Sequence, residues 1–351
     1  MNQTKVAFLP IWGKLNETIP QQQMAAIREM GGEASYGVPG TFFPLTRTIR
    51  RYHPNVISLD WIHQYALAPG LFQSLIKSFL FVLDVWIARI LFRVKLVWTF
   101  HNLQHHDPRP RKLERWVSSF FAKNCVKVRI LGDGVQEIVS SYLRIPEEKL
   151  VVIPEGPYIG WYPEGESRAS AREKLQLATN DKVWLYLGTL RPYKGVESLI
   201  EVYHSLKAPD LKLVVAGNPW NKEYADSLIS LAKGNPGIKI HAFSVPDDDL
   251  QTYFAASDLV ILPFKQVLNS GSVLLAMGFG KPVVAPRIGL IPFRLCKQPE
   301  LLFDEQNPLD KVLRNCLAMS NHRLESMGKE NRFEALRYSW KDFAGFVVKE
   351  V

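Results

Sequence analysis

The sequence predicts an α/β protein made of two doubly wound parallel-sheet domains that face each other across a cleft. Short apolar runs alternate with helical patterns along the whole chain, which is the order expected of βαβ units. At 351 residues, with 47% hydrophobic and 22% charged residues, the chain can form two full cores. A stretch rich in Gly and Pro, residues 154–167, separates two such series and indicates the connector.

The first domain is expected to span residues 1–157. Its strands are predicted at 5–11, 56–60, 95–100, 127–131 and 150–153, and its helices at 21–30, 46–52, 69–92, 112–123 and 134–142. The most apolar stretch, 67–98, has no run of 18 uncharged residues and is not a convincing membrane span. We interpret it as a long core helix before a strand, and a helix inserted into a membrane surface is the alternative.

The second domain is expected to span residues 158–335. Its strands are predicted at 183–187, 212–216, 238–242, 259–262 and 282–285, and its helices at 196–206, 224–232, 247–256 and 272–279. The last residues, 336–351, contain a helical pattern that could return to the first domain. Both domains are therefore Rossmann-like, and ligands of such sheets lie at the carboxyl ends of the strands.

Charge and cysteine content narrow the class of partner. The chain has a net charge of +9, and residues 1–157 hold 19 Lys or Arg against 12 Asp or Glu, a net +7. No nucleic-acid motif accompanies this charge, so we expect no nucleic-acid partner and favour a lipid surface. Three separated cysteines without C-x-x-C spacing argue against disulfides or zinc and suit structural thiols in a reducing cytoplasm. No signal peptide is expected from the first residues.

One turn of the second domain combines glycine with two cations. An apolar run ends at Gly188, and Arg191 and Lys194 follow before a helix that begins near Gly195. Cations at a helix start oppose the helix dipole, which favours a bound anion there. A charged turn exposed to solvent is the alternative. We predict that this turn holds a diphosphate.

A second turn has the same character. The buried run at 259–262 is followed by Asn269, Ser270, Gly271 and Ser272, which precede an apolar helix. The first amides of that helix can hold another edge of the phosphates. Together, the two turns predict a nucleoside diphosphate sugar as ligand.

Two weaker signals complete the predicted donor site. Gly217 and Asn218 follow the strand at 212–216, where small residues permit close approach of a ligand. Phe243 follows the strand at 238–242, where a nucleobase often lies in such folds, and a core aromatic residue is the equally good alternative.

A histidine-rich segment follows the strand at 95–100. It contains His101, His106 and Asp107, and it resembles a metal cluster, but no partner spacing supports a metal and none is expected. Removal of a proton from an acceptor hydroxyl is the better use. Asp107 is the first choice of general base, and His101 or His106 the next. A capped loop before the next helix is the alternative.

Basic residues then alternate with aromatic residues over 109–129. On a helix from residue 112, Trp116, Phe120 and Lys123 fall near one stripe, which can rest on an anionic bilayer. A solvated basic face over core aromatic residues is equally compatible with this pattern.

The segments YLGTLRPYKGVESL, AGNP and PFKQVLNSGSVLLAMGFGKPVVAP together resemble the GT-B glycosyltransferases. The likeness is greatest to the bacterial exopolysaccharide β-mannosyltransferases of the xanthan-assembly type, and TFHNLQHHD is similar to their T-x-HNL-x-x-H-[DE] segment. The resemblance implies an inverting enzyme that moves mannose from GDP-mannose to a polyprenyl-diphosphate-linked oligosaccharide. It also implies a cytoplasmic protein, peripheral on the inner face of the plasma membrane, that needs no cofactor.

Departures from the wider group qualify this resemblance. The paired glutamates of the retaining GT-B enzymes would fall at Val267 and Leu275, which supports the inverting group. Glu155 stands where the xanthan-type enzymes have His. Residues 60–63, Asp-Trp-Ile-His, stand where those enzymes have a His-Trp-Pro-Glu-like stretch. One alternative is a GT-B transferase that uses UDP-glucose or UDP-glucuronate. Another is a non-catalytic nucleotide-sugar-binding partner of another transferase. A nucleotide-sugar epimerase fits less well.

Overall fold

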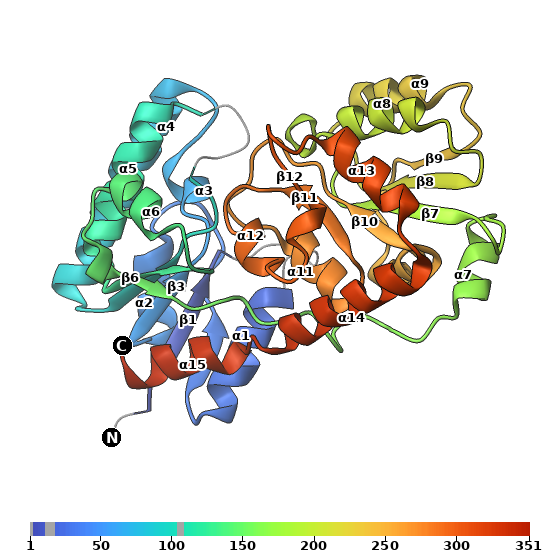
Figure 1. Ribbon diagram of the computed structural model, residues 1–351. Helices are drawn as coiled ribbons and strands as arrows, with labels where there is room; N and C mark the ends of the chain where they lie inside the picture. The colour runs from blue at the N-terminus through green and yellow to red at the C-terminus, as the bar shows by residue number, and fades with distance from the viewer. Residues whose placement is uncertain (1–2, 11–17, 104–108) are drawn as a thin grey trace. The chain divides into compact units, whose positions relative to one another are not determined.

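The computed structural model describes residues 3–10, 18–103 and 109–351 and divides the chain into two units. Unit 1 comprises Met1–Glu155 and Tyr338–Val351, and unit 2 comprises Gly156–Arg337. The boundaries predicted from the sequence are 157 and 335. Each unit is a six-stranded, wholly parallel sheet with helices on its faces (Figure 1), which confirms the predicted α/β class and the two doubly wound sheets.

The sheet of unit 1 has the strand order β2-β1-β3-β4-β5-β6. The order reverses between β1 and β3, so the carboxyl ends of these two strands form the switch point at which such sheets bind ligands. Its strands are β1 (Lys5–Leu9), β2 (Glu33–Tyr36), β3 (Val56–Leu59), β4 (Lys95–Thr99), β5 (Lys127–Ile130) and β6 (Leu150–Val152). Its helices are α1 (Thr18–Glu29), α2 (Pro44–Tyr52), α3 (His63–Ala66), α4 (Leu71–Trp86), a π-helical turn η2 (Ile87–Leu91), α5 (Arg111–Asn124), α6 (Gln136–Leu143), η3 (Glu147–Lys149) and α15 (Trp340–Lys349).

The last helix belongs to unit 1. α15, red in Figure 1, packs against α1, and its Phe343 ring lies 6.3 Å from that of Phe8 and 4.6 Å from the Arg129 guanidinium carbon. Arg129 is buried and donates to the backbone oxygens of Ile153 and Pro154. The C-terminal helix is thereby fastened to the core of the first domain.

The sheet of unit 2 has the order β12-β11-β10-β7-β8-β9, with its reversal between β7 and β10. Its strands are β7 (Lys182–Leu187), β8 (Leu211–Ala216), β9 (Ile238–His241), β10 (Leu259–Ile261), β11 (Val283–Pro286) and β12 (Leu302–Phe303). Its helices are α7 (Arg168–Lys174), η4 (Pro192–Lys194), α8 (Val196–Leu206), α9 (Lys222–Ala232), η5 (Asp247–Asp249), α10 (Leu250–Ala256), α11 (Gly271–Gly278), α12 (Ile291–Arg294), η6 (Pro299–Leu301), α13 (Leu309–Ala318) and α14 (Asn321–Leu336).

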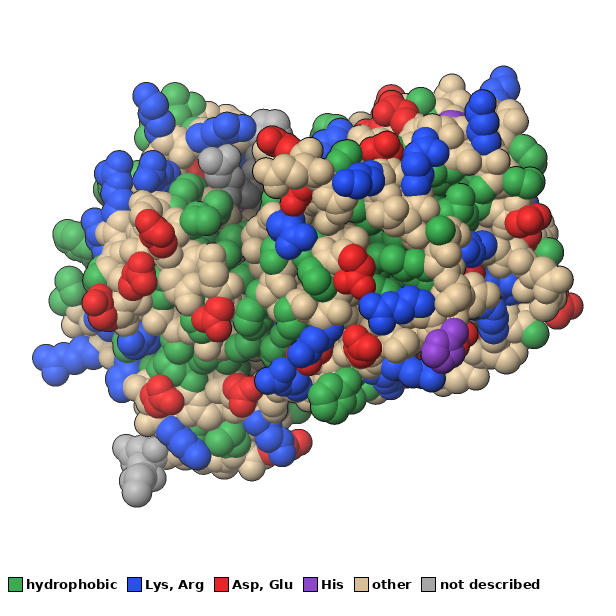
Figure 2. Space-filling view, viewed as in Figure 1, with side chains coloured by type: hydrophobic (Ala, Val, Ile, Leu, Met, Phe, Trp, Pro, Cys, Tyr) green, Lys and Arg blue, Asp and Glu red, His purple; other side chains and the backbone are tan. Residues whose placement is uncertain are grey.

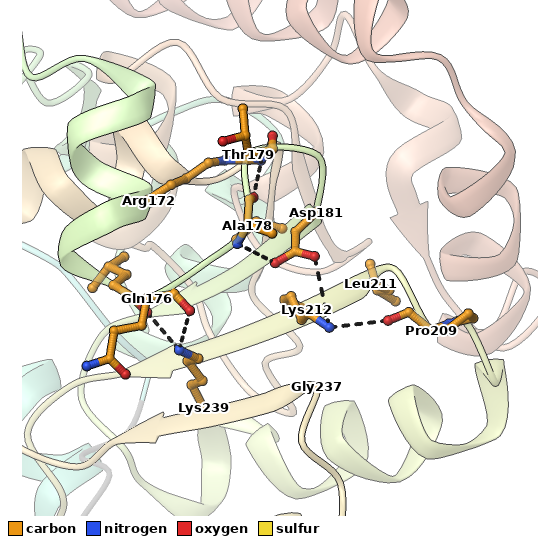
Figure 3. Close-up of polar contacts among 12 residues, drawn as sticks. Arg172, Gln176, Ala178, Thr179, Asp181, Pro209, Leu211, Lys212, Gly237 and Lys239 are labelled. Carbon is orange, nitrogen blue, oxygen red and sulfur yellow. Dashed lines mark hydrogen bonds and ion pairs between the residues drawn. The ribbon is translucent and has the colours of Figure 1, made fainter.

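Polar contacts fasten the amino ends of the unit 2 strands (Figure 3). Lys239 of β9 donates to the backbone oxygens of Leu175 and Gln176, both at 2.8 Å, and the Asp181 carboxylate accepts from the Ala178 amide at 2.8 Å. These contacts hold the loop between α7 and β7 at one edge of the sheet. The turns predicted to bind a ligand leave the sheet at the opposite edge.

One sequence interpretation is wrong. The stretch expected to be a long core helix forms α4 and η2, and its large apolar side chains are mostly exposed, among them Phe72 at 75% and Phe79 at 68%. The helix itself was predicted correctly, but most of its large apolar side chains do not belong to the core. Within the described residues, no helix is both long and apolar enough to cross a membrane.

Two strands were missed, and one cysteine differs from expectation. β2 has the sequence EASY and β12 has only two residues, so neither gives an apolar run that predicts a strand. All three cysteines are free thiols; Cys125 and Cys316 are buried, as expected of structural thiols, whereas Cys296 is exposed.

Candidate functional site

The first predicted turn leaves the end of β7. The strand is buried up to Leu187, and the Tyr186 hydroxyl then donates to the Thr189 backbone oxygen at 2.8 Å. The chain passes through η4 to Gly195, whose φ of +72° lies in the left-handed region, and α8 begins at the next residue. A Cβ on Gly195 would lie only 2.1 Å from the Pro263 backbone oxygen. A glycine is therefore required for this turn to meet the segment after β10.

The two turns are also joined by the backbone. The Lys265 amide donates to the Tyr193 oxygen at 2.9 Å. The ammonium of Lys194 lies 4.2 Å from the centre of the Phe264 ring and 5.3 Å from that of Tyr193. The cation therefore rests between aromatic rings, one from each turn.

The charged form of Lys194 is disfavoured in this position. Burial lowers its pKa to about 8, and the nearby charge of Arg191 acts in the same direction. A bound anion would offset both effects, because it attracts the charged form of the lysine. The arrangement therefore favours a negatively charged ligand beside Arg191 and Lys194.

The second turn ends at the start of α11. Ser270 is the N-cap residue, and its buried hydroxyl accepts from the Val273 amide at 3.4 Å. The first turn of α11 contains Gly271 and Ser272 and no acidic residue. Its backbone N–H groups and the positive end of the helix dipole are suited to an anion.

Gly188 lies where three turns meet. A Cβ on Gly188 would lie 3.3 Å from the Ser272 Oγ, and a Cβ on Gly217 would lie 1.7 Å from the Gly188 backbone oxygen. The backbone oxygen of Asn218 accepts from the Leu190 amide at 2.9 Å. The structure therefore brings the predicted turns after β7, β8 and β10 to one edge of the unit 2 sheet. Asn269 precedes the cap residue of α11 on the same segment.

Phe243 extends this edge toward β9. Its ring is half exposed and stacks on His241 at 5.8 Å between centroids, while the His241 Nδ1 lies 2.9 Å from the Tyr253 hydroxyl. The His241 backbone oxygen accepts from the Gly217 amide at 3.0 Å. Phe243 is therefore attached to the glycine turn and is not the core aromatic residue of the alternative interpretation.

Sequence reasoning missed the aromatic support of Lys194 and a nearby acid. Phe264 follows the buried strand β10 and stands directly before Lys265. Its place just after a buried strand was the signal that could have indicated a role in the site. Glu197, in the first turn of α8, has its Oε2 4.0 Å from the Lys265 Nζ. The spacing of Glu197 and Lys265 in the sequence does not predict this contact. The two charges come together only because the two turns meet.

In unit 1, a carboxylate meets one of the predicted bases. Asp60 follows β3 and His101 follows the neighbouring β4, and the His101 Nε2 lies 3.4 Å from the Asp60 Oδ1. The Trp61 ring stacks on His101, with centroids 4.3 Å apart and planes 11° apart. Asp60 is 7% exposed, and its backbone oxygen accepts from the Trp98 indole at 3.1 Å. A carboxylate and an imidazole therefore lie side by side just after the carboxyl ends of β3 and β4.

The other two predicted bases, His106 and Asp107, lie outside the described residues. Asp60 was singled out in the sequence only as part of a departure from the resembling family. Its pairing with His101 follows from the register of β3 and β4, in which Leu59 lies beside Trp98.

Comparison with known proteins finds a family match within unit 2. Residues 167–308 match the family model of the glycosyl transferases group 1. A GDP-mannose:glycolipid 4-beta-D-mannosyltransferase of Xanthomonas campestris pv. campestris is 27% identical over 240 residues, 66% of this chain and 61% of that protein. A D-inositol 3-phosphate glycosyltransferase of Corynebacterium efficiens is 26% identical over 276 residues, 73% of this chain and 65% of that protein.

A solved structure covers both units. Anabaena Alr3699/HepE in complex with UDP-glucose matches with a TM-score of 0.74 and 16% sequence identity over 99% of each chain. This likeness shows a shared fold. The chain spans about three fifths of the length of the mannosyltransferase that it matches.

Proposed function

The chain carries a glycosyltransferase group 1 domain within a GT-B fold, and we propose that it is an inverting transferase acting on a lipid-linked acceptor. It would move a sugar, mannose in the first place, from a nucleoside diphosphate to a lipid-linked oligosaccharide in exopolysaccharide synthesis. Such a protein would be peripheral on the cytoplasmic face of the plasma membrane.

The meeting of three turns at Gly188 carries this proposal. Arg191, Lys194 and the start of α11 lie at one edge of the sheet. A bound diphosphate would offset the positive charge of the two side chains and of the helix start. These groups would bind the diphosphate more strongly as its charge increases during cleavage of the sugar bond. The same groups would therefore serve both donor binding and departure of the leaving group.

Displacement in one step accounts for the chemistry. The acceptor hydroxyl would lose its proton to a base of unit 1 while its oxygen attacks C1 of the sugar. The bond from C1 to the diphosphate oxygen would break, and its electron pair would leave with the diphosphate. Val267 and Leu275 offer no carboxylate from unit 2, which supports inversion. No metal or other cofactor is needed in this scheme.

The base is proposed among the residues that follow β4. Asp107 remains the first candidate from the sequence resemblance, with His101 and His106 next. The contact between Asp60 and His101 supports His101, because the carboxylate would stabilise the imidazolium formed on proton transfer. Asp107→Ala is expected to abolish transfer and to leave nucleotide affinity within a few fold.

The donor and acceptor are proposed from the relatives. The name of the Xanthomonas relative supports GDP-mannose and a glycolipid, here a polyprenyl-diphosphate-linked acceptor. The complex of Alr3699/HepE with UDP-glucose supports a uridine nucleotide as the second candidate, with UDP-glucose or UDP-glucuronate as donor. Asn218 and Phe243 are the proposed contacts beyond the phosphates, together with the diphosphate residues Gly188, Arg191, Lys194, Gly217, Asn269, Ser270, Gly271 and Ser272.

A thermal-shift screen of GDP-mannose, UDP-glucose and UDP-glucuronate tests the donor, because a ligand of the native state raises the melting temperature. The largest increase is expected with GDP-mannose, and Arg191→Gln should reduce it. Arg287→Gln, which removes a guanidinium paired with Asp304, is the matched control. No response to any of the three would contradict nucleotide-sugar binding, whereas binding without transfer to a polyprenyl-diphosphate oligosaccharide would favour the non-catalytic alternative.

A further inference from the structure

α4 buries a side that carries three polar residues, Ser74, Ser78 and Asp84, together with Phe81 and Val85. The buried Ser74 hydroxyl exchanges hydrogen bonds with the Ala68 backbone at 2.7 and 2.9 Å, and the buried Ser78 hydroxyl donates to the Ala66 oxygen at 2.8 Å. The buried Asp84 carboxylate accepts from the first amides of α2, those of Leu45 at 2.8 Å and Thr46 at 2.9 Å. These bonds fix which side of the helix faces the protein.

The opposite side of the helix is apolar and exposed. Its large side chains recur every three or four residues and form one stripe along α4 and η2, which we name the α4 face. It consists of Leu71 (60% exposed), Phe72 (75%), Leu75 (50%), Ile76 (45%), Phe79 (68%), Leu83 (38%), Trp86 (53%), Ile90 (65%) and Leu91 (72%). Exposed apolar surface of this extent on one element is typical of an interaction site.

The helices around the α4 face carry cations without exposed acids. α2 and α5 pack against α4. Across these helices and η2, the acidic residues are Asp84 and Glu114, and both are buried. Arg47, Arg50, Arg51, Arg93, Arg111, Lys112, Arg115 and Lys123 are exposed. Figure 2 shows basic side chains gathered over the end of unit 1 that holds α4 and α5.

Part of the sequence-predicted basic and aromatic stretch belongs to this border. On α5, Trp116 is 54% exposed and stacks on the half-buried Phe120, with ring centroids 6.0 Å apart. Arg115 lies over Tyr142 of α6 and donates to the Ser141 and Tyr142 oxygens. The outward aromatic contribution of α5 is therefore Trp116.

We propose that the α4 face inserts into the acyl boundary of a bilayer that contains anionic lipids, with the surrounding cations on the headgroups. An apolar stripe bordered by Lys and Arg matches both layers of such a surface. A second copy of this chain matches it less well, because it would bring the same cations together without acids to pair them. The inference deepens the proposed function and rests on it, since a glycolipid acceptor would lie in the same bilayer.

Vesicle flotation tests the surface with the full-length chain. Vesicles of phosphatidylcholine alone are compared with vesicles that contain phosphatidylglycerol, using wild type, Phe79→Glu and Phe72→Glu/Phe79→Glu. Phe333→Glu, at a similarly exposed phenylalanine of unit 2, is the matched control. All variants are checked by circular dichroism, by sedimentation velocity and by the thermal shift with the donor found for the wild type.

We expect binding to the anionic vesicles that weakens with salt and falls at least about tenfold in the double variant, with no change in Phe333→Glu. Equal vesicle binding by the double variant and the wild type would overturn the inference. So would sedimentation of the wild type as a dimer and of the double variant as a monomer. A wild type that binds the donor but no vesicle would overturn this inference and leave the donor proposal standing. Vesicle binding lost in the double variant, with no donor response in any protein, would support the surface and count against the proposed function.

Discussion

The carboxylate of Asp60 lies 3.4 Å from the Nε2 of His101, with Trp61 stacked on the same imidazole. Asp60→Asn removes the negative charge beside the imidazole, so kcat should fall at least about tenfold while donor affinity stays within a few fold. Asp133→Asn, at an exposed acid of the same unit, is the control. An unchanged kcat in Asp60→Asn would reject a role for this pairing in the reaction.

Donor binding should weaken as the pH rises through about 8, the pKa to which burial and Arg191 lower Lys194. The lysine is charged below that pH and neutral above it, so affinity for the diphosphate should fall by up to about tenfold per pH unit if the bound form stays protonated. Titration calorimetry with the nucleoside diphosphate at about pH 7 and pH 9 measures this. Lys194→Gln should bind weakly at both, and an equal pH dependence in that variant would assign the effect elsewhere.

Gly195→Ala should damage both stability and donor binding. The substitution places a Cβ in the left-handed region and 2.1 Å from the Pro263 oxygen. Gly234→Ala is the matched control, because Gly234 has a φ of +84° but nothing within 4 Å of its Cβ position. Denaturant unfolding should show a loss of about 1–2 kcal/mol in the control and about 1–3 kcal/mol more in Gly195→Ala. Equal losses would mean that the two turns do not depend on this contact.

Asp258→Ala should destabilise unit 2. The Asp258 carboxylate, nearly buried, accepts from the Val183 amide at 2.8 Å and from the buried Arg172 guanidinium at 3.1 Å. Its removal leaves a buried cation without its carboxylate, so the free energy of unfolding should fall by about 3–5 kcal/mol. Asp226→Ala breaks the exposed pair with Lys222 and should leave the free energy of unfolding nearly unchanged. Similar effects of both substitutions would contradict the assigned role of burial.

Much of the fold follows from periodicity and from the places of glycine. Buried strands such as β7 and β10 are mostly apolar runs, and the residues after them reach the switch point because the strand order places them there. The meeting of Gly188, Gly217 and Ser272 was therefore accessible to sequence reasoning. β2 was not, because an edge strand with the sequence EASY needs no apolar alternation.

The orientation of α4 and the partner of His101 show what periodicity leaves open. A helical stripe of apolar residues does not say whether it faces the core, and here Ser74, Ser78 and Asp84 decide the matter by satisfying backbone groups of neighbouring segments. Asp60 and His101 are 41 positions apart, and only the pairing of β3 with β4 brings them together.

The difference among the three thiols offers a way to attach a reporter to the unmodified protein. Maleimide dyes react with thiolates, and burial raises the pKa of Cys125 above its usual range and that of Cys316 to about 12. Cys296 is the exposed thiol, so a native preparation should take up one fluorophore, on unit 2. Its emission could then follow donor arrival in real time without any engineered cysteine.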